Sequence, residues 1–281
     1  MRQAAPHPRA GTRLALALGL LALAGASCES APWSGHYARV NGIRMYYEVH
    51  GHGPPLVLLH GGGGSGHVFS EQIPAFAKHF RVILPDMRAH GRTSDGAGPL
   101  TYHAMAEDIV ALLDHLEVPR AEVMGWSDGG IVGLDLAIHH PERVNHLVTF
   151  GANFTPDGYT QEALDWINGA NAQSFGAASR TAYDRVAPDP SHYETAMNRV
   201  LALWRTQPNF TLADLRSIHA PTLIAAGEHD MVRQDHTETL AHAIPGARLW
   251  IVAGATHGAI FEEPELVERT VLDFLLDRTG R

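Results

Sequence analysis

The sequence contains a single cysteine, Cys28, so the chain cannot form a disulfide within itself. Positive charge is also scarce: 21 Lys and Arg stand against 30 Asp and Glu, and the net charge of −9 gives no electrostatic support to nucleic-acid binding. The 19 histidines are scattered, and none lies in the close spacing with cysteine or glutamate that is typical of metal sites. We therefore expect no metal centre and no nucleic-acid partner.

Long apolar runs are rare as well, and the most apolar one lies close to the N-terminus. It is Leu14–Ala24, "LALALGLLALA", which is too short to span a bilayer comfortably. Arg2, Arg9 and Arg13 precede or flank it without any acidic residue, as in the basic region of a signal peptide. We expect residues 1–28 to be an export signal, which places the mature protein outside the bacterial cytoplasm.

Cys28 directly follows small residues in "GASC". This arrangement resembles the lipobox of bacterial lipoproteins, in which the cysteine is lipidated and attaches the protein to a membrane, although Gly25 stands where leucine is usual. The alternative is a periplasmic or secreted protein cleaved at a site such as Ala24–Ala26, with Cys28 incidental. We favour lipidation of Cys28 over simple secretion.

From residue 37 the pattern alternates between apolar strands and amphipathic helices. Asn41-Gly42 predicts a hairpin. Short apolar runs then predict strands buried on both faces, at 55–61, 80–86, 121–126, 144–152, 220–230 and 247–254. Between them, segments such as 101–117 repeat apolar residues every three or four positions, as an amphipathic helix does. The fold class is therefore α/β, with a mostly parallel sheet covered by helices on both faces.

One segment interrupts this alternation. Residues 155–215 contain helical patterns but no convincing buried strand. An insertion of this length is usually functional, and open α/β sheets bind ligands at the carboxyl ends of their strands. We predict that residues 35–154 and 216–281 form the core and that residues 155–215 form a helical cap over those strand ends.

The most informative motif is "GWSDGG", residues 125–130, between a predicted strand and a predicted helix. Glycines on both sides of Ser127 allow a tight, strained turn that presents the hydroxyl at a helix N-terminus. A G-x-S-x-G string occurs by chance in many proteins, but in this strand–turn–helix context it indicates a nucleophile elbow. A plain glycine-rich turn is the alternative.

A nucleophilic serine needs a base, and the base needs a carboxylate to orient it. His257 follows the last predicted strand in a glycine-flanked loop, and Asp230 follows the strand before it. The order Ser, Asp, His fits this type of elbow. Glu228 is the rival acid and His229 the rival base.

Negative charge that develops on a substrate oxygen needs hydrogen-bond donors. The glycine run "HGGGGSG", residues 60–66, follows a predicted strand and offers a backbone N–H from Gly62 or Gly63. The N–H of Asp128, next after the serine, is the second expected donor. A merely flexible loop is the alternative for the glycine run.

Together, His60-Gly61, "DMRAHGRTS", "GWSDGG", "GEHD" and "GATHG" resemble the α/β-hydrolase superfamily. The resemblance extends from Gly35 to the C-terminus, and around Ser127 the sequence looks most like the valacyclovirase or biphenyl hydrolase-like serine hydrolases. It implies an eight-stranded sheet and hydrolysis of carboxylic esters through an acyl-enzyme, without metal or organic cofactor. Ala89 and Thr93 depart from the usual glycine and serine but lie outside the catalytic set.

The expected substrate is a small ester, including amino-acid esters. Carbon–carbon bond hydrolases, lactonases, aminopeptidases and perhydrolases share the triad and stay open, whereas the intact triad disfavours a binding protein without turnover. Trp126, beside the serine, is expected to contact substrate. Asp128 has two interpretations: its carboxylate either complements the helix dipole or is free to bind a substrate ammonium group.

Overall fold

The computed structural model describes residues 35–277. The predicted signal segment and its candidate lipidation site, Cys28, lie outside these residues. Within them, no helix is both long enough and apolar enough to cross a membrane.

Eight strands form one sheet in the order β1-β2-β4-β3-β5-β6-β7-β8, as expected for the α/β-hydrolase fold. The β1–β2 and β2–β4 pairs are antiparallel and the other pairs are parallel. The strands are β1 (His36–Val40), β2 (Ile43–His50), β3 (Pro55–Leu59), β4 (Arg81–Pro85), β5 (Ala121–Trp126), β6 (Val144–Phe150), β7 (Thr222–His229) and β8 (Arg248–Thr256).

The hairpin turns where the sequence predicts it. Asn41 and Gly42 both have positive φ, at 42° and 78°, which is the conformation that a two-residue hairpin turn requires. The two strands that it joins form the antiparallel edge of the sheet.

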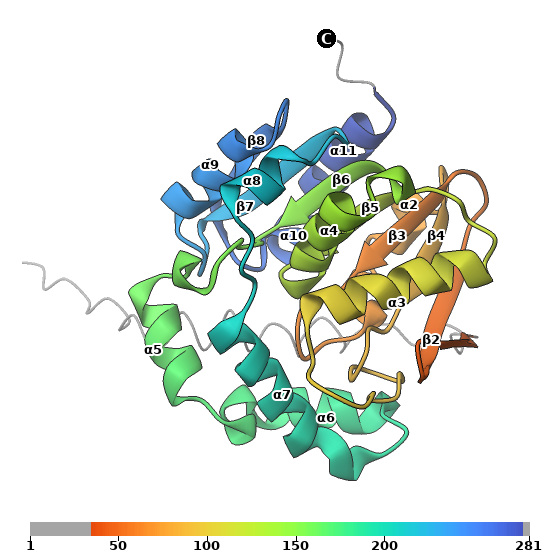
Figure 1. Ribbon diagram of the computed structural model, residues 1–281, viewed down its shortest axis with the longest axis vertical. Coiled ribbons are helices and arrows are strands. Elements are labelled where there is room, and N and C mark those ends of the chain that lie inside the picture. The colour runs from red at the N-terminus through yellow and green to blue at the C-terminus, as the bar shows by residue number, and fades with distance from the viewer. Residues whose placement is uncertain (1–34, 278–281) are drawn as a thin grey trace, which may run out of the picture.

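Helices cover both faces of the sheet (Figure 1). They are α2 (Ile73–Phe76), α3 (Tyr102–His115), α4 (Asp128–His139), α5 (Gln161–Gly169), α6 (Gly176–Val186), α7 (Tyr193–Thr206), α8 (Leu212–Arg216), α9 (Gln234–Ala243), α10 (Ala259–Glu262) and α11 (Pro264–Leu275). Short 3-10 helices span Gly66–Phe69, Pro141–Arg143, Pro156–Gly158, Ala172–Phe175 and Pro190–His192.

The core has two layers because successive residues of a strand point to opposite faces. Val57 of β3 and Val123 of β5 pack with α3, α4 and α9, whereas Leu56 and Met124, their chain neighbours, pack with α2 and α11. A strand buried on both faces has no polar alternation, which is why the strands read as continuous apolar runs.

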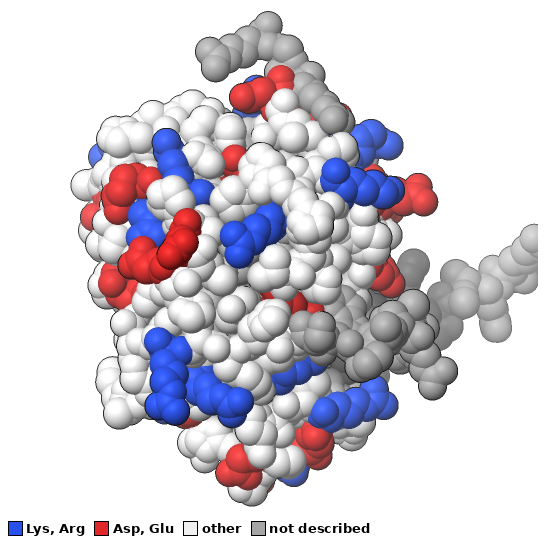
Figure 2. All heavy atoms as spheres, turned by 90° about the vertical axis from the view of Figure 1, so that its right-hand side faces the viewer, with Lys and Arg blue, Asp and Glu red and all other residues white. Residues whose placement is uncertain are grey.

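Residues 155–215, the predicted cap, contain α5, α6, α7 and most of α8 and none of the eight strands. In Figure 1 helices α5, α6 and α7 lie together at one end of the molecule, away from α11. Charged side chains of both signs are interspersed over the face shown in Figure 2. The carboxyl ends of the central strands lie between the core and the cap helices α5, α6 and α7.

Candidate active site

Ser127 occupies a sharp turn between β5 and α4. Its φ of 55° and ψ of −122° lie in a region that L-residues rarely adopt, and such strain typically costs about 1–3 kcal/mol. The flanking glycines are required by close contacts: a Cβ on Gly125 would lie 2.1 Å from the carbonyl oxygen of Gly129, and a Cβ on Gly129 would lie 2.0 Å from that of Leu59. The motif therefore encodes the turn through its glycines.

The three residues predicted as a triad come together at the carboxyl ends of three strands. The Oγ of Ser127 is 3.0 Å from Nε2 of His257, and Nδ1 of His257 is 2.7 Å from Oδ1 of Asp230. With the Nδ1 proton donated to the carboxylate, Nε2 can accept the proton of the serine hydroxyl. Asp230 also accepts backbone N–H groups, from Val232 at 3.0 Å and from Gly227 at 3.3 Å.

The rival residues lie elsewhere. Glu228 is exposed and accepts the backbone N–H of Gly254 at 2.8 Å, and His229 is exposed at the end of β7. Neither takes the place of Asp230 or His257 in the hydrogen-bonded chain.

Two opposing effects set the pKa of His257. Burial lowers it, but the negative charge of Asp230 and the hydrogen bond that His257 donates to this carboxylate raise it more, so that the pKa lies above the usual 6.5. Trp126 holds the same loop by donating its indole N–H to the carbonyl oxygen of His257 at 2.8 Å. The base is thus held in place through both its side chain and its backbone.

The glycine run after β3 lies against the serine. A Cβ on Gly61 would lie 3.2 Å from Cβ of Ser127, and one on Gly62 would lie 2.3 Å from Oδ2 of Asp128. Gly63 has a positive φ of 73°. The N–H of Asp128 is the first of α4 and has no partner within that helix. The structure therefore places Gly62 with Ser127 on one pocket wall and Asp128 directly after the serine, and the binding of an oxyanion by Gly62, Gly63 and Asp128 stays a prediction.

His60, which precedes the glycine run, holds the glycine loop in place through both of its ring nitrogens. Its Nδ1 is 2.7 Å from the carbonyl oxygen of Gly61, and its Nε2 accepts the backbone N–H of Met87 at 2.9 Å. Burial lowers the pKa of His60 to about 4, so the ring is neutral at pH 7 and can both donate and accept. Asp86 adds a second link by accepting the N–H of Gly66 at 2.7 Å. The sequence motif included His60, but its spacing gave no sign of this bracing role.

Of the two interpretations of Asp128, the one with a free carboxylate is wrong, whereas the residue does lie in the first turn of α4, as the helix-dipole interpretation requires. The residue is 1% exposed. Its side chain accepts the indole N–H of Trp204 at 2.8 and 3.0 Å and the hydroxyl of Tyr102 at 3.0 Å. Burial raises its pKa to about 6, while these two hydrogen bonds oppose the rise. Asp128 therefore joins the nucleophile turn to the cap helix α7 and to α3, contacts that cross 76 and 26 residues.

A narrow, mainly apolar pocket opens beside Ser127. It is lined by Gly62, Trp126, Ser127, Tyr159, Trp204, Met231 and His257. Trp126 thus reaches the pocket wall, and its contact with substrate stays a prediction. Tyr159, Trp204 and Met231 were not identified from the sequence, because only packing of the cap on the core brings them to the serine.

Comparison with known proteins agrees with this geometry. The family described as alpha/beta hydrolase fold matches residues 54–199. A Caulobacter protein of strain K31 named "Putative carbamate hydrolase RutD" is 31% identical and aligns over 82% of this chain and 95% of its own. A crystal structure of a Pseudomonas aeruginosa hydrolase has 31% identity and a TM-score of 0.70 over 87% of this chain and 99% of that one.

A further solved structure, Est816, is described as an N-acyl homoserine lactone degrading enzyme. It has 27% identity and a TM-score of 0.69, and the match covers 85% of this chain and 100% of that one. These matches do not single out the valacyclovirase-like group. From its sheet, its nucleophile turn and its relatives, the chain belongs to the α/β-hydrolase family and is a hydrolase.

Proposed function

We propose that this hydrolase cleaves small carboxylic esters through an acyl-enzyme on Ser127. The observation that carries the proposal is the continuous hydrogen-bonded chain from Ser127 through His257 to Asp230, with distances of 3.0 and 2.7 Å. This arrangement supports nucleophilic attack by a serine on a carbonyl carbon.

In the first step Nε2 of His257 takes the hydroxyl proton while Oγ of Ser127 attacks the carbonyl carbon. The negative charge on the substrate oxygen is stabilised by backbone N–H groups of Asp128 and of Gly62 or Gly63. His257 then protonates the leaving alcohol as the ester bond breaks. A water molecule, deprotonated by the same nitrogen, releases the acid, and Asp230 stabilises the imidazolium in both steps.

The pocket supports a small, uncharged acyl group. Its side-chain lining beyond the serine and histidine comes from Trp126, Tyr159, Trp204 and Met231. The carboxylate of Asp128 is buried, accepts hydrogen bonds from Trp204 and Tyr102 and does not line this pocket, so it is poorly placed to pair with a substrate ammonium group. We therefore prefer plain acyl esters to amino-acid esters.

Carbamate hydrolysis is the second candidate, favoured by the name of the relatives that align over most of this chain. The same machinery would form a carbamoyl-enzyme, since a carbamate offers a carbonyl flanked by a leaving group. The name of Est816 adds lactones as a third class to test.

The test is a comparison of kcat/KM for p-nitrophenyl acetate, butyrate and octanoate, a phenyl carbamate, an acyl homoserine lactone and an alanine ester. We expect the short uncharged esters to be turned over fastest. Faster turnover of the carbamate or lactone would replace the ester proposal while leaving the serine mechanism intact.

The serine mechanism has its own test. Ser127→Ala should lower kcat by about 10³-fold or more with folding retained. Ser217→Ala, which changes an exposed serine after α8, is the matched control and should keep full activity. Fluorophosphonate labelling of any serine other than Ser127 would overturn the assignment.

We also propose that residues 1–28 direct export and that Cys28 carries a lipid. The support is the basic, apolar and small-residue order of this segment. Stable anchoring needs more than one acyl chain, as in a multiply acylated terminus. Intact mass of membrane-extracted protein should show added lipid that Cys28→Ala lacks, and an unlipidated mature terminus would contradict the proposal.

A further inference from the structure

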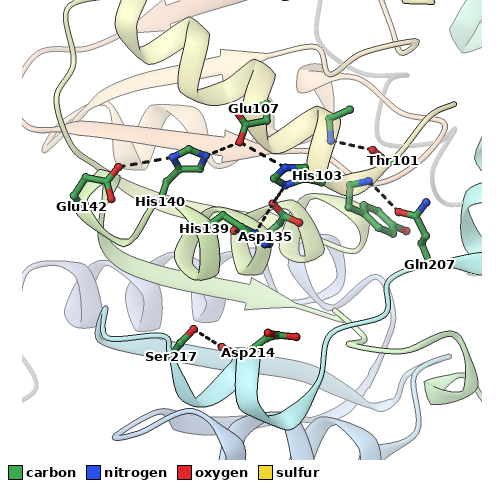
Figure 3. Close-up of polar contacts among 12 residues, drawn as sticks. Thr101, His103, Glu107, Asp135, His139, His140, Glu142, Gln207, Asp214 and Ser217 are labelled. Carbon is green, nitrogen blue, oxygen red and sulfur yellow. Dashed lines mark hydrogen bonds and ion pairs between the residues drawn. The ribbon is translucent and has the colours of Figure 1, made fainter. Parts of the chain in front are cut away.

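Two histidines and an aspartate meet on the outer side of α3 and α4, apart from the triad. His103 comes from the first turn of α3, and Asp135 and His139 come from successive turns of α4 (Figure 3). Asp135 lies eight residues after Ser127, which corresponds to about 12 Å along the axis of α4 at a rise of 1.5 Å per residue.

Both imidazoles face the same carboxylate oxygen. The Nδ1 atoms of His103 and His139 lie 2.9 Å and 3.1 Å from Oδ1 of Asp135, and the ring centroids of the two histidines are 4.7 Å apart. The side chain of Asp135 is only 4% exposed, whereas those of His103 and His139 are 55% and 45% exposed. A nearly buried carboxylate thus stands beneath two imidazoles that water can reach.

This arrangement suits one divalent transition-metal ion. One ligand atom from each residue can be chosen so that all three lie within 4.8 Å of one another. Zinc binds nitrogen and oxygen at about 2.0–2.2 Å, so two ligands at a tetrahedral angle lie roughly 3.3–3.6 Å apart. The observed separations from Oδ1 are a few tenths of an ångström shorter, which small rotations of two exposed side chains can adjust.

We propose that His103, Asp135 and His139 form a binding site for a borderline divalent cation of the Zn²⁺ class. Two imidazoles and one carboxylate match the ligands that Zn²⁺ prefers over Mg²⁺, which favours oxygen ligands. Bound there, the ion links α3 to α4, the helix that begins directly after the nucleophile.

The surroundings leave room for the remaining coordination positions. The three residues border an open hollow whose other wall comes from the segment after α7, including Gln207, Asn209 and Asp214. Asp214, whose pKa is lowered mainly by hydrogen bonds from Thr211 and in part by His139, adds negative charge near the site. A water molecule or a small anionic ligand can therefore complete the coordination from the hollow.

A second carboxylate lies near the other ring nitrogen of His103, beyond hydrogen-bond distance. Oε1 of Glu107, one turn further along α3, lies 3.9 Å from Nε2 of His103 and 2.6 Å from Nε2 of His140. Metal-ligating histidines commonly donate their other ring N–H to a carboxylate, and a small rotation of the exposed His103 or Glu107 side chain would bring these two groups into such contact. Figure 3 shows this continuous row of polar side chains along the two helices.

The test uses the full mature chain without an affinity tag. Titration calorimetry with ZnCl₂ at pH 7.5 should give one bound Zn²⁺ per chain that MgCl₂ does not compete away, and zinc should raise the melting temperature. The absorption spectrum of bound Co²⁺ should report the same site. His103→Gln, Asp135→Asn and His139→Gln should each weaken binding at least about tenfold, the loss expected when a coordinated metal loses a key interaction.

His242→Gln, which changes an exposed histidine of α9 outside the three, is the matched control and should leave the affinity unchanged. Absence of zinc binding, equal binding by MgCl₂, or unchanged affinity in the His103 and His139 variants would overturn the proposal in favour of a simple hydrogen-bonded cluster.

Discussion

Replacing Asp128 with asparagine should change the pH dependence of stability in a direction that its burial determines. The pKa of this carboxyl is raised from 3.8 to about 6, with burial as the largest cause. Between these values the unfolded chain releases the proton while the folded chain retains it. Stability is therefore greatest below pH 4 for this group and falls as the pH rises through 6.

The size of the effect follows from the shift. A rise from 3.8 to about 6 corresponds to about 3 kcal/mol of stability lost between pH 4 and pH 7.5. Asparagine has nearly the same shape and an oxygen that can still accept the bonds from Trp204 and Tyr102, but it does not ionise. The free energy of unfolding of Asp128→Asn, relative to wild type, should thus increase by about 3 kcal/mol over this pH range.

The assay is urea unfolding at several pH values from 4 to 7.5, followed by tryptophan fluorescence. The prediction concerns how the difference in the free energy of unfolding between Asp128→Asn and wild type varies with pH. A constant contribution of the new amide group to this difference does not affect the result. Asp165→Asn, which removes an exposed carboxylate of the cap helix α5, is the control. A difference between Asp128→Asn and wild type that does not vary with pH would refute the reasoning.

Three further predictions concern the same region. Because the pKa of His257 lies above 6.5, kcat/KM should fall below that pKa as the base is protonated, and a profile flat down to pH 5 would contradict its role. Trp204→Phe removes the indole donor to the buried Asp128 and should cost about 1–3 kcal/mol in urea unfolding at pH 8, whereas no cost would mean that the bond is unimportant. Burial lowers the pKa of His60 to about 4, so the unfolded chain takes up this proton at a higher pH than the folded chain does. The free energy of unfolding should therefore fall by up to about 3 kcal/mol as the pH falls from 6.5 to 4, and His60→Gln should lack this acid-dependent loss.

Part of this structure could be predicted because it is encoded locally. The glycines at 125 and 129 let β5, α4 and β3 approach so closely that no side chain fits, and this need is visible in the motif. Asn41-Gly42 likewise predicts its own turn, since two successive residues with positive φ suit few other sequences. Strands buried on both faces show themselves as apolar runs of four to eight residues.

The contacts of polar side chains could not be predicted, because they depend on which distant elements pack together. The sequence placed Asp128 after the nucleophile, but Tyr102 and Trp204, which occupy its carboxylate, come from two other helices. Asp135 and His139 are visible as neighbours on one helix, yet His103 joins them only because α3 packs against α4. The expectation of no metal site considered only the spacing of residues along the sequence, and that spacing does not show that His103 lies beside Asp135 and His139.

The sequence by itself thus determined the α/β class, the order of Ser127, Asp230 and His257, and the turn at the serine. Backbone conformation and burial periodicity are short-range properties, so neighbouring residues suffice to specify them. Only the tertiary structure decided that Asp128 holds the cap rather than standing free, and that Tyr159, Trp204 and Met231 form the pocket wall. These outcomes depend on desolvation and on partners many residues away, which exist only once the cap has packed on the sheet.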